Sequence, residues 1–83
     1  MASYQVELTR SAEKDLRRID RSRVVLLYEA IERLGDDPRP YGSKKLVGAD
    51  RTYRIRVGDY RIVYEIEDEV LVVRIRLGGC RLQ

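Results

Sequence analysis

Three arginines follow one side of a predicted β-hairpin and could together bind a phosphate group. Arg54, Arg56 and Arg61 stand in the segment YRIRVGDYRIVYEI, in which apolar residues alternate with polar ones. A guanidinium can offer two parallel hydrogen bonds to two phosphate oxygens, so a row of arginines suits a phosphate chain. The same row is compatible with a solvated face, in which arginine stems cover apolar neighbours and the charged heads stay in water. The pattern alone leaves both interpretations open.

The residue types that the chain lacks narrow the possible chemistry. It has no histidine and a single cysteine, Cys80. We therefore expect neither a zinc site of the usual kinds, nor a histidine-based catalytic triad, nor an internal disulfide. The sequence also lacks a glycine-rich phosphate loop. Any chemistry would depend on arginine, lysine, tyrosine and carboxylates, and we expect no cofactor and no metal.

The kind of cation is more informative than the net charge. Seventeen basic and fourteen acidic residues give a net charge of +3, which alone would not indicate a nucleic-acid partner. Fourteen of the basic residues are arginines, and arginine binds phosphate in two-pronged geometry better than lysine does. The positions of these arginines therefore carry the information.

Length and hydropathy predict one soluble domain spanning residues 1–83. No apolar run approaches the roughly 20 residues that span a bilayer. The first ten residues lack the apolar region of a signal peptide. We therefore expect a cytoplasmic protein.

The hairpin is expected to lie within an α+β fold of the order β-α-α-β-β-β. The expected strands are residues 4–8, about 52–57, 60–66 and 70–77, with a short edge piece within 44–47. Two amphipathic segments, 9–20 and 21–35, are separated by almost nothing, which predicts an antiparallel helical hairpin. This hairpin would pack on one face of a mainly antiparallel sheet.

Capping residues and apolar spacing define the two expected helices. Thr9 or Ser11 could cap the first helix and Ser22 the second, and Gly35 is a natural residue to end the second. The residues expected to face the core are Ala12, Leu16 and Ile19 in the first helix and Val24, Leu27, Tyr28, Ile31 and Leu34 in the second.

Strand alternation assigns each hairpin residue to a face of the sheet. A two-residue turn at Gly58 and Asp59 pairs Arg56 with Arg61. The residues then expected under the helices are Tyr53, Ile55, Val57, Tyr60, Ile62, Tyr64 and Ile66. The opposite face would carry Arg54, Arg56, Arg61, Val63 and Glu65.

The register of the last strand follows from the cost of burying charge. A connection of two or four residues directs Leu71, Val73, Ile75 and Leu77 to the core, and an odd one would bury Arg74 and Arg76. The even register places these two arginines, with Val70 and Val72, on the outer face. Five arginines would then share that face, with Glu65 as the only strand carboxylate beside them.

The chain resembles a known toxin superfamily, and its second half carries the most specific motifs. The segment DPRPYGSKKLVG, followed by YRIRVGDYRIVYEIEDEVLVVRIRLG, is similar to the RelE/ParE toxins, and to the RelE branch in particular. The resemblance covers nearly the whole chain and implies a RelE-like microbial RNase fold. It further implies a metal-independent, ribosome-dependent mRNA endonuclease, an mRNA interferase, that a RelB-like antitoxin holds inactive. Its partners would be the ribosome, mRNA and this antitoxin.

The resemblance also implies roles for individual residues. By motif match, the catalytic cations would be Arg54 and Arg56 before the turn, Arg61 after it, and Arg81 near the C-terminus. We expect Arg61 to lie nearest the charge that develops during cleavage. Further RNA contacts are expected from Lys44, Lys45, Arg74 and Arg76.

The last residues depart from the family pattern and keep other functions open. Relatives commonly end in a segment resembling VGHRREVYR, whereas this chain reads LGGCRLQ. Gly79 and Cys80 take the places of a histidine and an arginine, and the terminal tyrosine has no counterpart. One alternative is a catalytically weakened member that binds antitoxin or RNA, and another is a ParE-like inhibitor of DNA gyrase. The antitoxin could cover either the arginines or a groove between the helices and the sheet edge.

Overall fold

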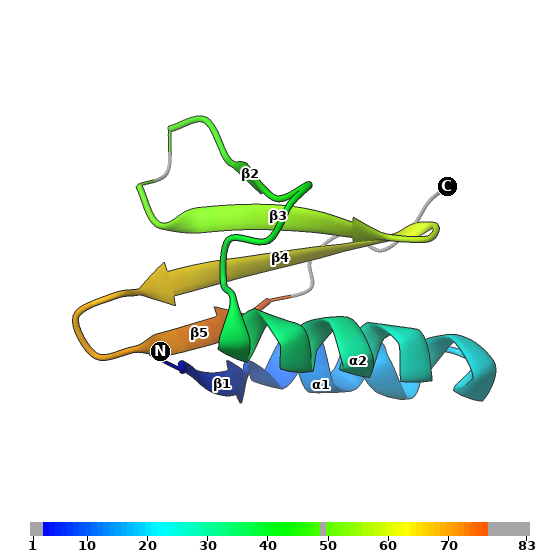
Figure 1. Ribbon diagram of the computed structural model, residues 1–83. Helices are drawn as coiled ribbons and strands as arrows, with labels where there is room; N and C mark the ends of the chain where they lie inside the picture. The colour runs from blue at the N-terminus through cyan, green and yellow to red at the C-terminus, as the bar shows by residue number, and fades with distance from the viewer. Residues whose placement is uncertain (1–2, 49, 77–83) are drawn as a thin grey trace.

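A five-stranded sheet with two helices forms the part of the chain that the computed structural model describes, residues 3–48 and 50–76 (Figure 1). The elements are β1 (Gln5–Leu8), α1 (Arg10–Arg17), α2 (Arg21–Asp36), β2 (Lys44–Lys45), β3 (Thr52–Val57), β4 (Tyr60–Glu67) and β5 (Val72–Ile75). The strand order is β1-β5-β4-β3-β2. β1 runs parallel to β5, and the other neighbouring pairs are antiparallel. The predicted α+β fold is confirmed, including the short edge strand.

The hydrophobic core lies between the helices and one face of the sheet. Helix α2 packs on β1, β5 and β3, and in Figure 1 both helices lie beside β1 and β5, on the side of the view opposite β2. The buried core residues are Ala12, Leu16, Leu27, Ile31, Leu34, Ile62, Tyr64, Ile66, Val73 and Ile75. Burial of this apolar surface is the main force that holds the two layers together. Neither helix in the described part is long and apolar enough to cross a membrane.

The hairpin adopts the register that alternation predicts. Arg56 pairs with Arg61 and Ile55 with Ile62, and Gly58 takes the positive φ, +61°, that the first position of a primed two-residue turn requires. The seven hairpin residues predicted to face the helices all belong to the core or pack against it. The opposite face of the sheet, called the outer face below, therefore carries the arginines.

One predicted helix cap is confirmed and the other is wrong. The Thr9 hydroxyl accepts a hydrogen bond from the Ala12 amide at 3.2 Å, which caps α1. Ser22 does not cap α2, because the helix already begins at Arg21 and Asp20 occupies the cap position. The chain turns between the helices within so few residues that Ser22 falls inside the first turn.

Gly35 and Tyr28 also differ from expectation. Gly35 does not end α2, which continues to Asp36. A Cβ atom at Gly35 would lie 3.1 Å from both the Tyr4 carbonyl oxygen and the Val6 Cγ2, so the glycine lets β1 approach the helix closely. Tyr28 is 45% exposed because the core-facing stripe of α2 is narrow and Tyr28 lies beside it.

The last strand is shorter than predicted. β5 covers Val72–Ile75, and a four-residue connection precedes it. Leu71 belongs to this connection, with φ +55° and 39% exposure, so its predicted place in the core is wrong. Val73 and Ile75 are buried as predicted, and Leu77 lies outside the described residues.

Candidate phosphate-binding face

Three guanidiniums from β3 and β4 share the outer face next to the hairpin turn. Arg56 and Arg61 are directly opposite each other, and Arg54 lies two residues before Arg56 on the same side of β3. These three residues are called the arginine cluster below. Arg56 and Arg61 are exposed and Arg54 is half-buried. Like charges that face each other across a pair of strands repel, so the pairing costs stability.

The arginine cluster is not neutralised from within the described part of the chain. Among residues 3–48 and 50–76, the ion pairs involve Arg39, Arg74 and Arg76, and none involves a cluster guanidinium. No side-chain hydrogen bond among the described residues involves the cluster either, and Arg56 and Arg61 are exposed. Such an arrangement can bind an anion with several charge-assisted hydrogen bonds.

Of the two predicted lysine contacts, one joins the cluster. Lys44 in β2 pairs with Arg54, which places both side chains on the outer face. Lys45 pairs with Tyr53, which packs against the core on the helix side of the sheet. Because neighbouring strand residues point to opposite faces, Lys44 lies on the face of the arginine cluster and Lys45 on the other, so the RNA contact predicted for Lys45 would have to come from the helix side.

Arg74 lies on the outer face but is held by acidic side chains. Its guanidinium nitrogens are 2.8 Å from a Glu67 oxygen, 3.5 Å from one of Glu7 and 3.7 Å from one of Glu65. The hydrogen bond from Arg74 keeps the pKa of Glu67 below its usual value. The face was predicted correctly for Arg74. The expectation that Glu65 would be the only strand carboxylate beside the arginines is wrong.

Arg76 is held more loosely than Arg74. Its guanidinium is 3.5 Å from a Glu65 oxygen, and its side chain is 56% exposed. Glu65 thus bridges the two arginines of the last strand region. Neither Glu7 nor Glu67 was predicted at this site. Glu7 lies on a strand distant in the sequence, and Glu67 lies one residue beyond the predicted end of β4.

A second polar cluster fixes the loop that leads from α2 to β2. The Arg39 guanidinium donates to both carboxylate oxygens of Asp68, at 2.8 and 3.3 Å, and to the Tyr53 hydroxyl at 3.1 Å. The Tyr4 hydroxyl donates to Asp68 at 2.6 Å. These bonds tie the loop to β3 and to the β4–β5 connection, and that connection to Tyr4 just before β1. No sequence signal pointed to this cluster, since its members come from four separate segments.

Hydrogen bonds and burial shift the pKa values of the side chains that anchor this loop. Hydrogen bonds from Arg39 and Tyr4 hold the pKa of Asp68 below its usual value, and the bond to Asp68 raises the pKa of Tyr4. Tyr64 is fully buried and donates to the Pro38 carbonyl oxygen at 2.8 Å. Burial raises the pKa of Tyr64 to about 12. The first part of the loop, at Pro38 and Arg39, is therefore held in place.

Comparison with known proteins identifies the family. Residues 6–79 match the model of the family described as ParE toxin of the type II toxin–antitoxin system parDE. The chain belongs to this family. It is thus a toxin of a type II toxin–antitoxin system within the RelE/ParE superfamily, as the sequence resemblance indicated.

Relatives with RelE names are similar to this toxin over most of their length. A candidate toxin of Methanocaldococcus jannaschii, RelE1, is 32% identical over 76 residues, which cover 86% of this chain and 84% of the relative. The RelBE2 toxin–antitoxin complex of Mycobacterium tuberculosis contains a chain with a TM-score of 0.86 and 28% identity, covering 100% of this chain and 97% of that one. The archaeal RelE–RelB complex of Pyrococcus horikoshii gives a TM-score of 0.80 and 26% identity, with 89% and 90% covered.

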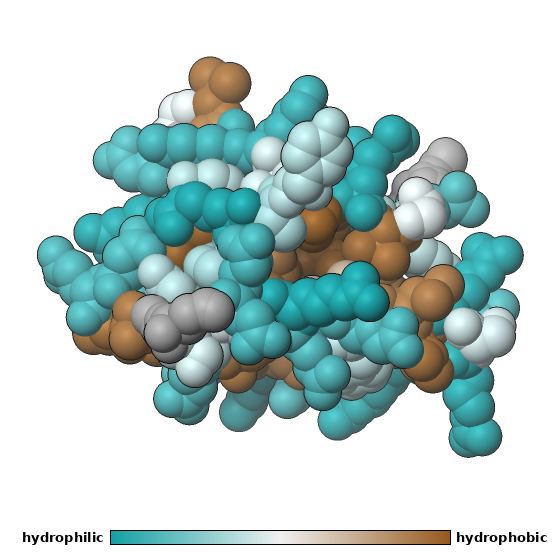
Figure 2. Space-filling view, in the orientation of Figure 1, coloured by the Kyte–Doolittle hydropathy of each residue, from teal (hydrophilic) through white to brown (hydrophobic). Residues whose placement is uncertain are grey.

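The toxin also carries an apolar groove on its helix side. A hollow of about 470 Å³ lies between α2 and β3, with Leu26, Ala30, Leu34, Ile55 and Val57 among its lining residues. Arg56 of the arginine cluster also lines it. Figure 2 shows apolar surface inside this hollow, bordered by hydrophilic side chains.

The predicted catalytic residue Arg81 lies outside the described residues, so the structure places three of the four predicted catalytic cations, all in the arginine cluster.

Proposed function

We propose that this toxin is an endoribonuclease that cleaves mRNA on the ribosome without a metal. The observation that carries the proposal is the arginine cluster, whose three guanidiniums share one face and make no ion pair within the described part of the chain. Maintaining Arg56 opposite Arg61 costs stability. A function in binding phosphate accounts for that cost, and a solvated surface does not.

The proposed reaction is an internal transesterification. The 2′-hydroxyl of a nucleotide attacks the neighbouring phosphorus, the bond from phosphorus to the 5′ oxygen breaks, and the products are a 2′,3′-cyclic phosphate and a 5′-hydroxyl. Negative charge builds up on the phosphoryl oxygens in the transition state. A guanidinium already aimed at those oxygens can stabilise it by roughly 3 kcal/mol, which corresponds to about a hundredfold in rate.

We assign the transition-state contacts to the cluster and the substrate contacts to its neighbours. Arg61 would lie nearest the developing charge, with Arg54 and Arg56 on the flanking oxygens. Lys44, opposite Arg54, would hold an adjacent phosphate. Arginine stays protonated at neutral pH and is a poor general base, so these residues supply electrostatic stabilisation, and the proton acceptor is a separate group.

The ribosome would supply much of the positioning. In-line placement of the attacking hydroxyl contributes as much as or more than charge stabilisation. The nearby carboxylate Glu65 already pairs with Arg74 and Arg76, so it is not assigned as the proton acceptor. A ribosome that holds the mRNA in a bent conformation would compensate for a site composed mainly of cations.

We further propose a RelB-like antitoxin as the partner of this toxin. The similar chains in the Mycobacterium tuberculosis and Pyrococcus horikoshii structures are each in complex with an antitoxin. An amphipathic peptide could use the apolar groove between α2 and β3, and an acidic segment could cover the arginine cluster. Both surfaces are open in the described part of this chain.

A ParE-like activity is the second candidate, because the matching family model carries the ParE name. Such a toxin would inhibit DNA gyrase through protein contact and would leave RNA intact. Controlled expression in cells separates the two. Incorporation of labelled amino acids falls first if mRNA is cut, whereas a DNA-damage reporter rises first if gyrase is the target.

The proposed activity is tested by mapping RNA ends on programmed ribosomes. Purified toxin is added to ribosomes stalled on a defined mRNA, and reverse transcription locates new ends. We expect cuts at the ribosome-bound codons and none in the same mRNA without ribosomes. An uncut message in both samples would contradict the nuclease proposal and favour a binding or gyrase-directed toxin.

A further inference from the structure

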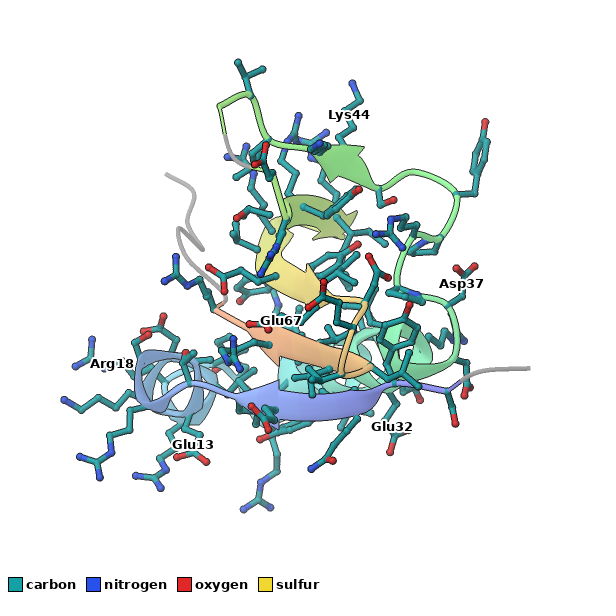
Figure 3. All side chains as sticks on the ribbon, turned by 90° about the vertical axis from the view of Figure 1, so that its left-hand side faces the viewer. Glu13, Arg18, Glu32, Asp37, Lys44 and Glu67 are labelled. Atoms are coloured by element: carbon teal, nitrogen blue, oxygen red, sulfur yellow. The ribbon has the colours of Figure 1, made fainter. Side chains whose placement is uncertain are left out.

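Cations and carboxylates on the outer face occupy opposite ends of the strands. The end near the hairpin turn carries Arg56 and Arg61 as one facing pair. The other end carries Glu65 and Glu67 in β4 and Glu7 in β1, which all reach Arg74. These three glutamates are called the acidic end below. Figure 3 shows Glu67 beside β5 and Lys44 on β2, at separate parts of the sheet.

A row of cations crosses the sheet next to the facing arginine pair. Lys44 pairs with Arg54, Arg54 pairs with Val63, and the Arg76 amide donates to the Val63 carbonyl oxygen at 2.7 Å. The row therefore runs over β2, β3 and β4 to Arg76, the residue that follows β5, with Val63 between the cations. At the usual spacing of strands this row spans roughly 14 Å, which is long enough for more than one phosphate.

The acidic end removes Arg74 from this positive surface. Three carboxylates surround the Arg74 guanidinium, and the charge of Arg51 also acts on Glu67, so three negative charges face two positive ones at this end. Glu67 stays ionised at neutral pH, since its hydrogen bond from Arg74 favours the charged form. A phosphate chain is attracted to the hairpin end and repelled where the strands continue toward the β4–β5 connection.

We infer that single-stranded RNA crosses the strands along the row Lys44, Arg54 and Arg76, and that the acidic end prevents it from lying along the strands. This inference rests on the proposed RNA substrate and deepens it by giving the chain a direction. Arg76, 3.5 Å from Glu65, is then the phosphate contact that lies nearest to the acidic end. Arg74, at the surface but surrounded by carboxylates, contacts no RNA.

The salt dependence of RNA binding tests this path. The probe is a short single-stranded 2′-O-methyl RNA, which lacks the attacking hydroxyl and cannot be cleaved, and its binding is measured without ribosomes over a range of salt. Each phosphate contact on a single strand contributes about 0.7 to the slope of log affinity against log salt. Arg76→Ala should lower affinity severalfold and reduce the slope by about 0.7.

Neutralising the acidic end should have the opposite effect. The double change Glu7→Gln with Glu67→Gln frees Arg74 and should raise both affinity and slope, the slope by up to about 0.7. The matched control is the double change Glu29→Gln with Glu32→Gln. Both residues are exposed on α2, so this variant removes the same two charges from the helix side. This control should leave the slope unchanged. Thermal unfolding confirms that each variant is folded.

Two results would overturn the path. One is an unchanged slope for Arg76→Ala while Arg54→Ala reduces it, and the other is a double glutamate variant that behaves like its helix-side control. Absence of any RNA binding by the wild-type toxin would overturn it as well. The binding assay contains no ribosome and measures no cleavage, so it tests the path separately from the nuclease. If the toxin cuts mRNA on ribosomes but the salt slopes of the variants equal that of the wild type, the path alone is rejected. If the slopes change as expected but no mRNA is cut, the nuclease proposal alone is rejected.

Discussion

Arg56 and Arg61 lie directly opposite each other across the β3–β4 hairpin, with no described carboxylate paired to either. A facing pair of like charges lowers sheet stability by a few tenths to about 1 kcal/mol. The pair therefore opposes folding while favouring an anionic ligand. Activity and stability should respond in opposite directions when one member is removed.

Replacing Arg61 by alanine separates the two effects. Arg61→Ala should slow mRNA cleavage by about a hundredfold or more, because a guanidinium aimed at the transition state is lost. The melting temperature should stay equal or rise slightly, since the repulsion disappears. Arg21→Ala removes the same charge from the exposed start of α2 and should leave cleavage unchanged. A fully active Arg61→Ala variant would show that the role assigned to Arg61 is wrong.

The buried hydroxyl of Tyr64 should matter for stability. Tyr64→Phe removes the hydrogen bond to Pro38 and leaves a buried carbonyl oxygen without that donor. We expect the free energy of unfolding to fall by about 1–2 kcal/mol, as measured by urea denaturation. Tyr28→Phe, at an exposed position, should change it by less than about 0.5 kcal/mol. Equal effects of the two substitutions would contradict the assigned bond.

The Arg39–Asp68 pair should make stability depend on pH in the acidic range. The pKa of Asp68 is lower in the folded protein than in the unfolded chain, where it is about 3.9. The stabilisation is therefore complete above that value and is lost as the pH falls through the lower folded-state pKa. Asp68→Asn should lower the melting temperature at neutral pH and flatten the acid limb of its pH profile. A variant whose acid limb matches the wild type would count against this pair.

The two helix starts should respond differently to loss of a hydroxyl. Thr9→Ala removes the cap of α1 and the bond from Thr9 to the Ile75 carbonyl oxygen, and should cost about 1–2 kcal/mol. Ser22→Ala should be neutral or slightly stabilising, because Ser22 lies within the first turn of α2, where alanine has the higher helix propensity. A loss of stability in Ser22→Ala comparable to that in Thr9→Ala would restore Ser22 as a cap. Both variants are compared by urea denaturation.

The arginine cluster could be predicted because every contact that defines it is local. A two-residue turn and strict alternation fix the register of Arg56 and Arg61 and hence the face that they share. The same reasoning gave the face of Arg74. The opposite faces of Lys44 and Lys45 could not be read from the loop sequence, because they depend on the pairing of the two-residue strand β2, in which Lys45 lies opposite the core-facing Tyr53.

The features that sequence reasoning missed depend on contacts between distant segments. Glu7 reaches Arg74 because β1 pairs in parallel with β5, and the sequence does not specify which strand lies beside the first one. Gly35 looks like a helix end in the sequence, yet its role is to let β1 pass close to α2. Arg39 meets Asp68 only once the helices and the sheet have set the position of the loop.

The most direct test of the proposed chemistry is a single change in the RNA. An mRNA is prepared with one 2′-deoxy nucleotide at a codon that the toxin cuts on the ribosome. If the 2′-hydroxyl attacks the phosphorus beside the arginine cluster, cleavage at that nucleotide should disappear, and the unmodified message should yield a 2′,3′-cyclic phosphate end. Cleavage that persists at the deoxy position would contradict the account.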